Sequence, residues 1–295
     1  MGGVVLRLFL CALLLLVGTP LYAQASPIQL KNKVITLKKV EIEQYGLDVI
    51  DASFIDNNKL HKLMDSLESE VYQEPQDAFF KKDGRIIAEK LGAALDRDKF
   101  EYLFRELYYS DKNGKLHVPV FPVYPKVDSG LLKEISTKAL GSYSTYYNQR
   151  NSERTDNIAL AAEAINNTVI FPRETFSFNE VVGERTVERG YKKAPVIVKG
   201  ELAEDIGGGI CQVSSTLFNA VDLKGIQIVE RYAHSRRVPY VPLGRDATVS
   251  WWGPDFVFKN LYNEPVLIRA SSQNGRMLVT IYSSDTVEYF NGNAE

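Results

Sequence analysis

The sequence predicts an α+β protein of two domains, a small mixed α/β domain at residues 26–130 and an α+β domain at residues 131–295 whose C-terminal part is rich in strands. Apolar residues recur at helical spacing in several segments, and short strand-like runs are separated by turn signals. The pair Asn274-Gly275 lies between two such runs and indicates a tight hairpin. The length of 295 residues agrees with about two domains.

The first 25 residues have the order of parts of a secretory signal peptide. Arg7 precedes the apolar run 8–17, Pro20 follows it, and Ala23-Gln24-Ala25 matches a cleavage pattern. An uncleaved anchor is the alternative, although the run is short of the roughly 20 residues that span a membrane. We expect a secreted or cell-wall-associated protein that meets the membrane only through this segment, if the segment is retained.

Composition excludes several function classes. The chain has 35 basic and 37 acidic residues and a net charge of −2, with no basic stripe. We therefore expect no nucleic-acid partner. His61, His117 and His234 lie too far from one another and from the cysteine to match a zinc-ligand spacing. The sequence predicts neither a metal nor a cofactor.

In the first domain, the sequence predicts a strand, a helix, a hairpin, a second helix and a proline-containing edge strand. The first helix is expected to begin at Asp56 or Asn57, and the second near Asp96 or Asp98, because aspartate and asparagine cap helices. The expected elements cover residues 34–40, 60–71, 78–87, 100–107 and 117–127.

The second domain is expected to begin with a helix capped by Thr155 or Asp156. A glycine turn at 207–209 precedes a second helix at 212–221. The remaining elements are expected to be strands, the last two forming the Asn274-Gly275 hairpin. These strands are predicted at residues 194–198, 226–229, 248–252, 256–258, 265–270 and 276–282.

Cys211 is the residue most open to chemistry. Cys11 lies in the signal segment, so Cys211 is the one cysteine of the exported chain. It follows Gly207-Gly208-Gly209 and lies in or before the first turn of an expected helix. Unpaired N–H groups and a partial positive charge at such a position favour a thiolate and can hold an oxyanion. A packed structural thiol is the alternative.

A thiolate nucleophile needs a base and a group that orients the base. His234 follows the strand expected at 226–231, and Asp246 comes shortly after it. We therefore name Cys211, His234 and Asp246 as candidate catalytic residues. Spacing alone does not show that the three meet, and a structural histidine and a turn aspartate are the alternatives.

Substrate contacts are expected from the glycine turn, the following helix and a cluster of arginines. Arginine forks bind carboxylates through both oxygens, whereas a solvated charged face is the plainer interpretation. Tyr240 and Trp251-Trp252 either line a cleft or belong to the core. The candidate substrate-binding residues are Gly208, Gly209, Gln212, Ser214, Arg231 and Arg236.

Several blocks between about residues 140 and 285 resemble the VanW family. The resemblance is carried by specific motifs, whereas residues 26–130 resemble more loosely the peptidoglycan-binding domain that often precedes VanW domains. Two positions depart from the family pattern, Arg173 after a proline and Arg245 before Asp246. The matching blocks are Phe176-Ser177-Phe178-Asn179, Val182-Gly183-Glu184-Arg185-Thr186, Gly190-Tyr191, Gly207 to Leu217, Glu230-Arg231, His234-Ser235 and Asp246 to Val249.

This resemblance implies a cell-wall protein whose partners are peptidoglycan stem peptides and glycan. Some members of the family act as L,D-transpeptidases, which form 3–3 cross-links through a cysteine. The family motif places that cysteine at Cys211. A non-catalytic envelope protein that binds peptidoglycan, with Cys211 structural, is the alternative function.

Overall fold

The structure is a computed structural model that describes residues 34–37, 41, 43–47, 51–110, 114–198 and 201–289. The expected signal segment, residues 1–25, lies outside the described residues, as do positions 38–40 of the first expected strand. None of the described helices is long and apolar enough to cross a membrane.

The centre of the C-terminal part is a four-stranded antiparallel sheet with the order β10-β16-β17-β9. The hairpin of β16 and β17 confirms the prediction, and its turn residues Asn274 and Gly275 have φ values of 50° and 71°, as a primed turn requires. The long strand β9, which pairs with β17, was not predicted. The strands are β9 (Lys138–Tyr146), β10 (Val169–Ile170), β16 (Val266–Gln273) and β17 (Arg276–Ser283).

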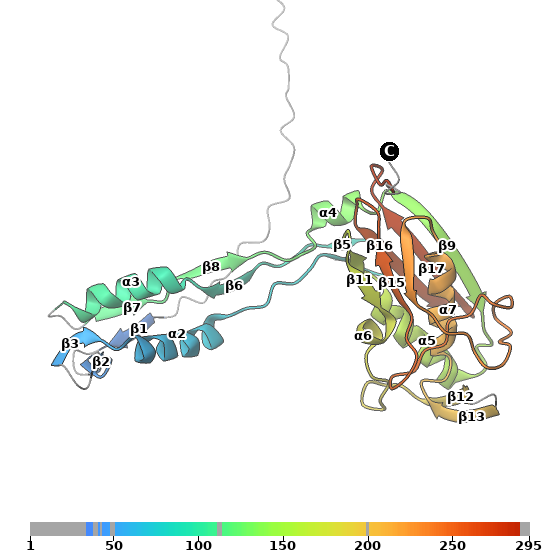
Figure 1. Cartoon of the computed structure of the whole chain (residues 1–295), viewed down its shortest axis with the longest axis horizontal. Coiled ribbons are helices and arrows are strands. Elements are labelled where there is room, and N and C mark those ends of the chain that lie inside the picture. Colours follow the sequence, from blue (N-terminus) through green and yellow to red (C-terminus); the bar gives the residue numbers. More distant parts are fainter. Residues whose placement is uncertain are drawn as a thin grey trace, which may run out of the picture.

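Helices α5 (Ser152–Ile165) and α7 (Ile210–Ala220) pack against this sheet, as Figure 1 shows. The predicted cap of α5 is wrong. Asn151 caps the helix by accepting a hydrogen bond from the amide of Arg154, and Thr155 and Asp156 lie within the first turns. The shared core includes Ile158, Ala161, Ile165, Val213, Leu217, Ile268, Val279 and Ile281.

A second, three-stranded antiparallel sheet has the order β11-β15-β14. The strand predicted at 248–252 is wrong. Residues 251–252 form a turn, and Thr248 makes only an isolated bridge to Tyr232. The short helix α6 follows β11, and the hairpin β12-β13 leads into α7. The elements are β11 (Thr175–Ser177), α6 (Phe178–Val182), β12 (Lys193–Val198), β13 (Glu201–Ile206), β14 (Ile226–Glu230) and β15 (Val257–Asn260).

The N-terminal elements have a core of their own, built from α2 (Asn57–Val71) and α3 (Arg97–Tyr108). Asp56 and Asp96 cap these helices, one from each predicted pair. In Figure 1 these elements lie apart from the C-terminal sheets. The strands form antiparallel pairs, β1 (Val34–Leu37) with β7 (Gly114–His117), β2 (Gly46–Leu47) with β3 (Asp51–Ile55), and β6 (Gly92–Leu95) with β8 (Val120–Val123).

The predicted hairpin at 78–87 is present as β4 (Phe79–Phe80) and β5 (Ile86–Ile87), and it contacts the C-terminal part. The side chain of Asn167 bonds both backbone groups of Phe80, each at 3.0 Å. Helix α4 (Ser129–Glu134) joins the same small core. The division at residue 130 stays a prediction, whereas separate helices with antiparallel sheets confirm the α+β class.

Candidate active site

The glycine turn before α7 brings the chain against β12 and starts the helix at Ile210. A Cβ on Gly208 would lie 2.4 Å from the carbonyl oxygen of Ala194, a distance that only glycine tolerates. Gly209 is the N-cap and has a φ of 110°, which disfavours any other residue. Cys211 therefore lies in the first turn of α7, as predicted.

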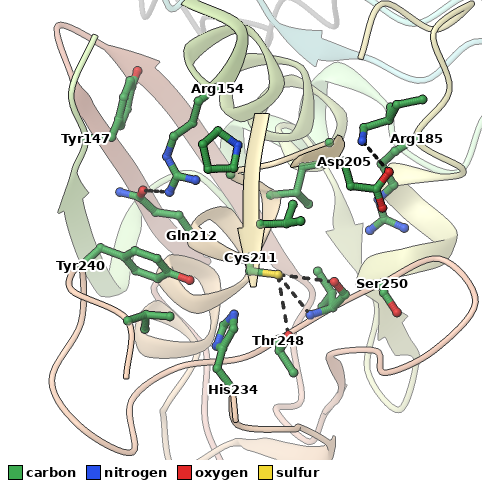
Figure 2. Close-up of a pocket in the computed structure, with 18 of the residues that line it drawn as sticks. Tyr147, Arg154, Arg185, Asp205, Cys211, Gln212, His234, Tyr240, Thr248 and Ser250 are labelled. Atoms are coloured by element: carbon green, nitrogen blue, oxygen red, sulfur yellow. Dashed lines mark hydrogen bonds between the residues drawn. The ribbon is translucent and has the colours of Figure 1, made fainter. Parts of the chain in front are cut away.

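The thiol of Cys211 is half-buried and faces the segment 248–249, as Figure 2 shows. Its Sγ lies 3.5 Å from the amide nitrogen of Val249 and 3.4 Å from the carbonyl oxygen of the same residue. The hydroxyl of Thr248 lies 3.8 Å away. An N–H group and a hydroxyl therefore face the sulfur, and both can donate to a thiolate.

His234 lies next to Cys211 in Figure 2, and the carboxylate of Asp246 holds it in place. The Asp246 Oδ2 atom lies 2.6 Å from the ring Nδ1 of His234 and 2.6 Å from its backbone nitrogen. Both side chains are nearly buried, with 6% of His234 and 10% of Asp246 exposed. The structure thus brings together the three residues named from the sequence, with the Nε2 atom of His234 left for the thiol.

The electrostatics of these residues favour an ion pair. Burial raises the pKa of the Cys211 thiol, but the hydrogen bond and charge of His234 outweigh it and lower that pKa below its ordinary value. Burial lowers the pKa of His234, and the contacts with Cys211 and Asp246 outweigh it and raise that pKa. Burial also opposes ionisation of Asp246, yet its hydrogen bonds to His234 lower its pKa. A thiolate and an imidazolium are therefore stabilised together.

The polar face of α7 fixes the segment that carries Asp246. Ser215 accepts a hydrogen bond from the amide of Ala247 at 2.9 Å, and Ser214 donates to the carbonyl of Ala247 at 2.6 Å. Asn219 donates to the carbonyl of Arg245 at 2.7 Å. Because these residues lie on the helix that carries the thiol, the helix positions both ends of the Cys-His-Asp arrangement.

A cavity of about 1040 Å³ opens in front of Cys211, large enough for a peptide. Its walls come from six parts of the chain. Figure 2 shows several of the lining residues around Cys211. Tyr240 stands at one wall, and burial raises the pKa of its hydroxyl well above the ordinary value, which keeps it protonated. The lining residues fall within the segments 146–154, 184–185, 195–196, 205–212, 234–240 and 248–254.

Two predicted substrate-binding residues, Gly209 and Gln212, line this cavity. The amide of Gln212 is occupied by its neighbours. Its Nε2 donates to the Thr145 hydroxyl and the Tyr146 carbonyl, each at 3.0 Å, and its Oε1 accepts from Arg154 at 2.8 Å. Gln212 therefore acts here as an anchor for Arg154.

The other four predicted substrate-binding residues do not line the cavity. Gly208 is packed against β12, and Ser214 is fully buried with its hydroxyl on Ala247. Arg231 donates to the carbonyl oxygen of Asp246 at 2.7 Å and stacks on Phe218, so its role is to hold the Asp246 segment. Arg236 is exposed outside the cavity.

Sequence reasoning missed two basic residues of the cavity. Arg154 comes from α5 and Arg185 from the segment after α6, so each is far from Cys211 in the sequence. No local signal marks Arg154, whereas Arg185 stands inside a motif block of the family. Of the two tryptophans, Trp251 is half-buried and Trp252 is 87% exposed. Within the described residues, no group of three or more acidic, histidine or cysteine side chains is placed to hold a metal ion.

This fold and site define an α+β protein with a thiol-centred Cys-His-Asp arrangement in a peptide-sized cavity. The family model described as "VanW like protein" matches residues 153–282. Every member of the Cys-His-Asp arrangement falls within this match. The chain belongs to the VanW family.

Two curated relatives also match the chain. The chain is 52% identical over 252 residues to "Uncharacterized protein YoaR" of Bacillus subtilis (strain 168), covering 85% of this chain and 83% of the relative. It is 33% identical over 109 residues to "Vancomycin B-type resistance protein VanW" of Enterococcus faecalis (strain ATCC 700802 / V583), covering 35% of this chain and 40% of the relative. No solved structure matches the chain.

Proposed function

We propose that this protein is a cysteine acyltransferase of the L,D-transpeptidase type that acts on peptidoglycan stem peptides. One observation supports it above the others: His234, held by Asp246 at 2.6 Å, lies beside a half-buried thiol whose pKa is lowered. A thiolate, a general base and a group that orients the base are the parts that covalent thiol catalysis requires. The cavity in front of them has room for a peptide.

In the first half of the proposed reaction, the Cys211 sulfur attacks the carbonyl carbon that follows an L-centre. The thiol proton goes to Nε2 of His234, and a carbon–sulfur bond forms. The tetrahedral intermediate then collapses, the carbon–nitrogen bond breaks, and His234 returns the proton to the departing amine of D-alanine. The product is a thioester on Cys211.

In the second half, the side-chain amine of a neighbouring stem attacks the thioester carbonyl. His234 accepts a proton from this amine, an amide bond forms, and the sulfur leaves as a thiolate. The net result exchanges one amide bond for another, a 3–3 cross-link. If water took the place of the amine, the same site would act as an L,D-carboxypeptidase.

The first turn of α7 supports the oxyanion that this reaction develops. The backbone amides of Ile210 and Gln212 are already occupied, because they donate to the carbonyl oxygens of Gly207 and Gly209. We therefore propose that the backbone amide of Cys211 itself binds the oxyanion. The positive end of the helix adds a favourable electrostatic contribution to the same oxygen.

The proposed setting is the cell wall. An N-terminal segment with the pattern of a signal peptide supports export. The name of the enterococcal relative connects it with vancomycin resistance, which supports a cell-wall role for this chain. We further propose that residues 26–130 bind peptidoglycan and hold the C-terminal site near its substrate.

The test is a reaction of the purified protein with tetrapeptide muropeptides. The proposal expects release of D-alanine together with cross-linked dimers, and loss of both in Cys211→Ala. Ser69→Ala, a small change on an exposed face of α2, serves as the matched control and is expected to retain activity. Equal product formation by Cys211→Ala and the unchanged protein would refute the proposal in favour of a binding role.

A further inference from the structure

Two cationic side chains in the cavity wall have no acidic partner in an ion pair of the described residues. These are Arg154 and Arg185, both half-buried. Glu184 and Asp205 also line the cavity, but both are exposed. Asp255, whose charge acts on Arg185, already accepts hydrogen bonds from Ser177 and from nearby amides.

Arg185 has a buried donor that no group of the protein satisfies. Its Nη2 donates to the Asn179 side chain at 2.8 Å, whereas Nη1 is buried without a hydrogen-bond partner. Burial lowers the pKa of this guanidinium, so the protein alone does not compensate its charge fully. An unsatisfied buried donor is costly and points to a ligand acceptor at that place.

Arg154 is held in a fixed orientation by a chain of hydrogen bonds. Its Nη2 donates to Gln212, and Gln212 is in turn bound to Thr145 and to the Tyr146 carbonyl. Burial lowers the pKa of this guanidinium as well. A planar fork that is already oriented loses little conformational freedom when it binds a carboxylate.

The two guanidinium groups flank the thiol. The charge of Cys211 acts on both of them, so both lie within electrostatic range of the sulfur. Figure 2 shows Arg154 and Arg185 on opposite sides of Cys211, in the same cavity. A peptide that crosses the sulfur along this line would pass one arginine on each side.

We propose that Arg154 and Arg185 form two separate carboxylate subsites, so that the substrate carries one carboxylate on each side of the carbonyl that Cys211 attacks. This inference rests on the proposed function and names the chemical class of its donor. One carboxylate belongs to the residue that leaves, which makes the cleavage remove a C-terminal amino acid. The other belongs to the part of the peptide that is transferred.

The experiment measures binding of defined peptides to the full chain carrying Cys211→Ser, which prevents thioester formation. The probe is N-acetyl-L-Ala-γ-D-Glu-L-Lys-D-Ala with both carboxylates free, amidated at D-Glu, or amidated at D-Ala. Each peptide is titrated calorimetrically into this protein and into the same protein with Arg154→Gln or Arg185→Gln. Arg154→Lys and Arg185→Lys, which keep the charge, show whether a glutamine variant fails only through misfolding.

We expect amidation of either carboxylate to weaken binding by about 10- to 100-fold, as for a charge-assisted hydrogen bond. The loss of affinity caused by amidating one carboxylate is expected to disappear when one of the two arginines is replaced by glutamine, and to persist when the other is replaced. Arg150→Gln, an exposed arginine that does not line the cavity, is the matched control and is expected to bind all three peptides as the parent does.

If amidation and arginine substitution weakened binding independently, their effects would add, and the two subsites would be overturned. They would also be overturned if the effects of both amidations depended on the same arginine. The outcome is separate from the proposed function because the measurement involves no turnover. If the unchanged protein formed no thioester while both couplings held, the carboxylate subsites would stand and the acyl transfer would fail.

Discussion

One carboxylate oxygen, Oδ2 of Asp246, accepts two hydrogen bonds from His234, one from its backbone nitrogen and one from its ring Nδ1, each 2.6 Å long. The first bond fixes where the residue sits, and the second fixes how its ring is turned. Because Nδ1 is committed to the carboxylate, the Nε2 atom is the one that can exchange a proton with the thiol. Asp246 therefore determines both the position and the tautomer of the proposed base.

Replacing this carboxylate, as in Asp246→Asn, is expected to slow thiol chemistry by about 10²- to 10⁴-fold, the usual contribution of a well-oriented base. The amide can hold the ring in the wrong tautomer, and it provides no negative charge for the imidazolium. The measurement is the rate of D-alanine release at saturating muropeptide. A rate within a factor of two of the unchanged protein would contradict this role.

The same substitution, Asp246→Asn, is expected to change the free energy of unfolding in a pH-dependent way. The pKa of Asp246 is lowered in the folded protein, so its contribution is present above the unfolded value of about 3.9 and is lost as pH falls through the folded value. At pH 7 we expect Asp246→Asn to reduce the free energy of unfolding by about 1.5–3 kcal/mol, as for hydrogen bonds to a charged group. Urea unfolding at pH 7 and pH 3 should show a smaller difference at the lower pH.

Alkylation by iodoacetamide tests the thiolate. Since the pKa of Cys211 is lowered by His234, we expect fast labelling near neutral pH and a rate that falls as pH drops through the lowered pKa. His234→Gln should move the midpoint of the rate profile to higher pH, because it removes the hydrogen bond and the charge that do most to oppose the effect of burial. The Cys211→Ser protein measures background labelling, and an unchanged midpoint in His234→Gln would count against the ion pair.

The imidazole gives the complementary measurement. Burial lowers the pKa of His234, and the hydrogen bonds and charges of Cys211 and Asp246 raise it. Cys211→Ala removes one of the raising contributions, so the pKa of His234 is expected to fall. Nuclear magnetic resonance of the ring protons can follow this titration, because the chain has only three histidines. A pKa that stayed the same or rose would show that the thiol and imidazole do not interact.

Ser215 is predicted to support the site from behind. Ser215→Ala leaves the buried amide of Ala247 without its acceptor, which costs about 1–3 kcal/mol of unfolding free energy. Because Ala247 adjoins Asp246, we also expect slower alkylation of Cys211. Ser69→Ala, whose hydroxyl bonds a carbonyl on an exposed helical face, should change neither quantity. Equal stability of Ser215→Ala and the unchanged protein would contradict this support.

Local patterns predicted the elements whose ends are set by local chemistry. Asp56 and Asp96 cap their helices, and Asn274-Gly275 forms the expected hairpin turn. The strand expected at 248–252 failed because Ser250 bonds backbone groups of Pro254 and Gly253, which turns the chain there. Its alternating apolar residues instead line the cavity and the core.

The three residues of the candidate site carried a sequence signal because a lone cysteine follows three glycines. The rest of the cavity carried no such signal, since Arg154 and Arg185 reach it only through the packing of α6 against α5 and of α5 against α7. The sequence predicts a ligand-binding role for Arg231 because arginines cluster near His234, as they do in carboxylate sites. In the structure, the Arg231 guanidinium instead donates a hydrogen bond to the backbone carbonyl oxygen of Asp246. Tertiary packing therefore decides which arginines face the cavity.

The proposed function requires that a stem peptide acylates Cys211. Intact-protein mass spectrometry of the chain after brief exposure to a tetrapeptide muropeptide tests it directly. We expect an added mass equal to the donor minus D-alanine, located on Cys211 and released by hydroxylamine, which cleaves thioesters. Absence of any adduct, with an unmodified and accessible thiol after prolonged exposure to the same donor, would contradict it.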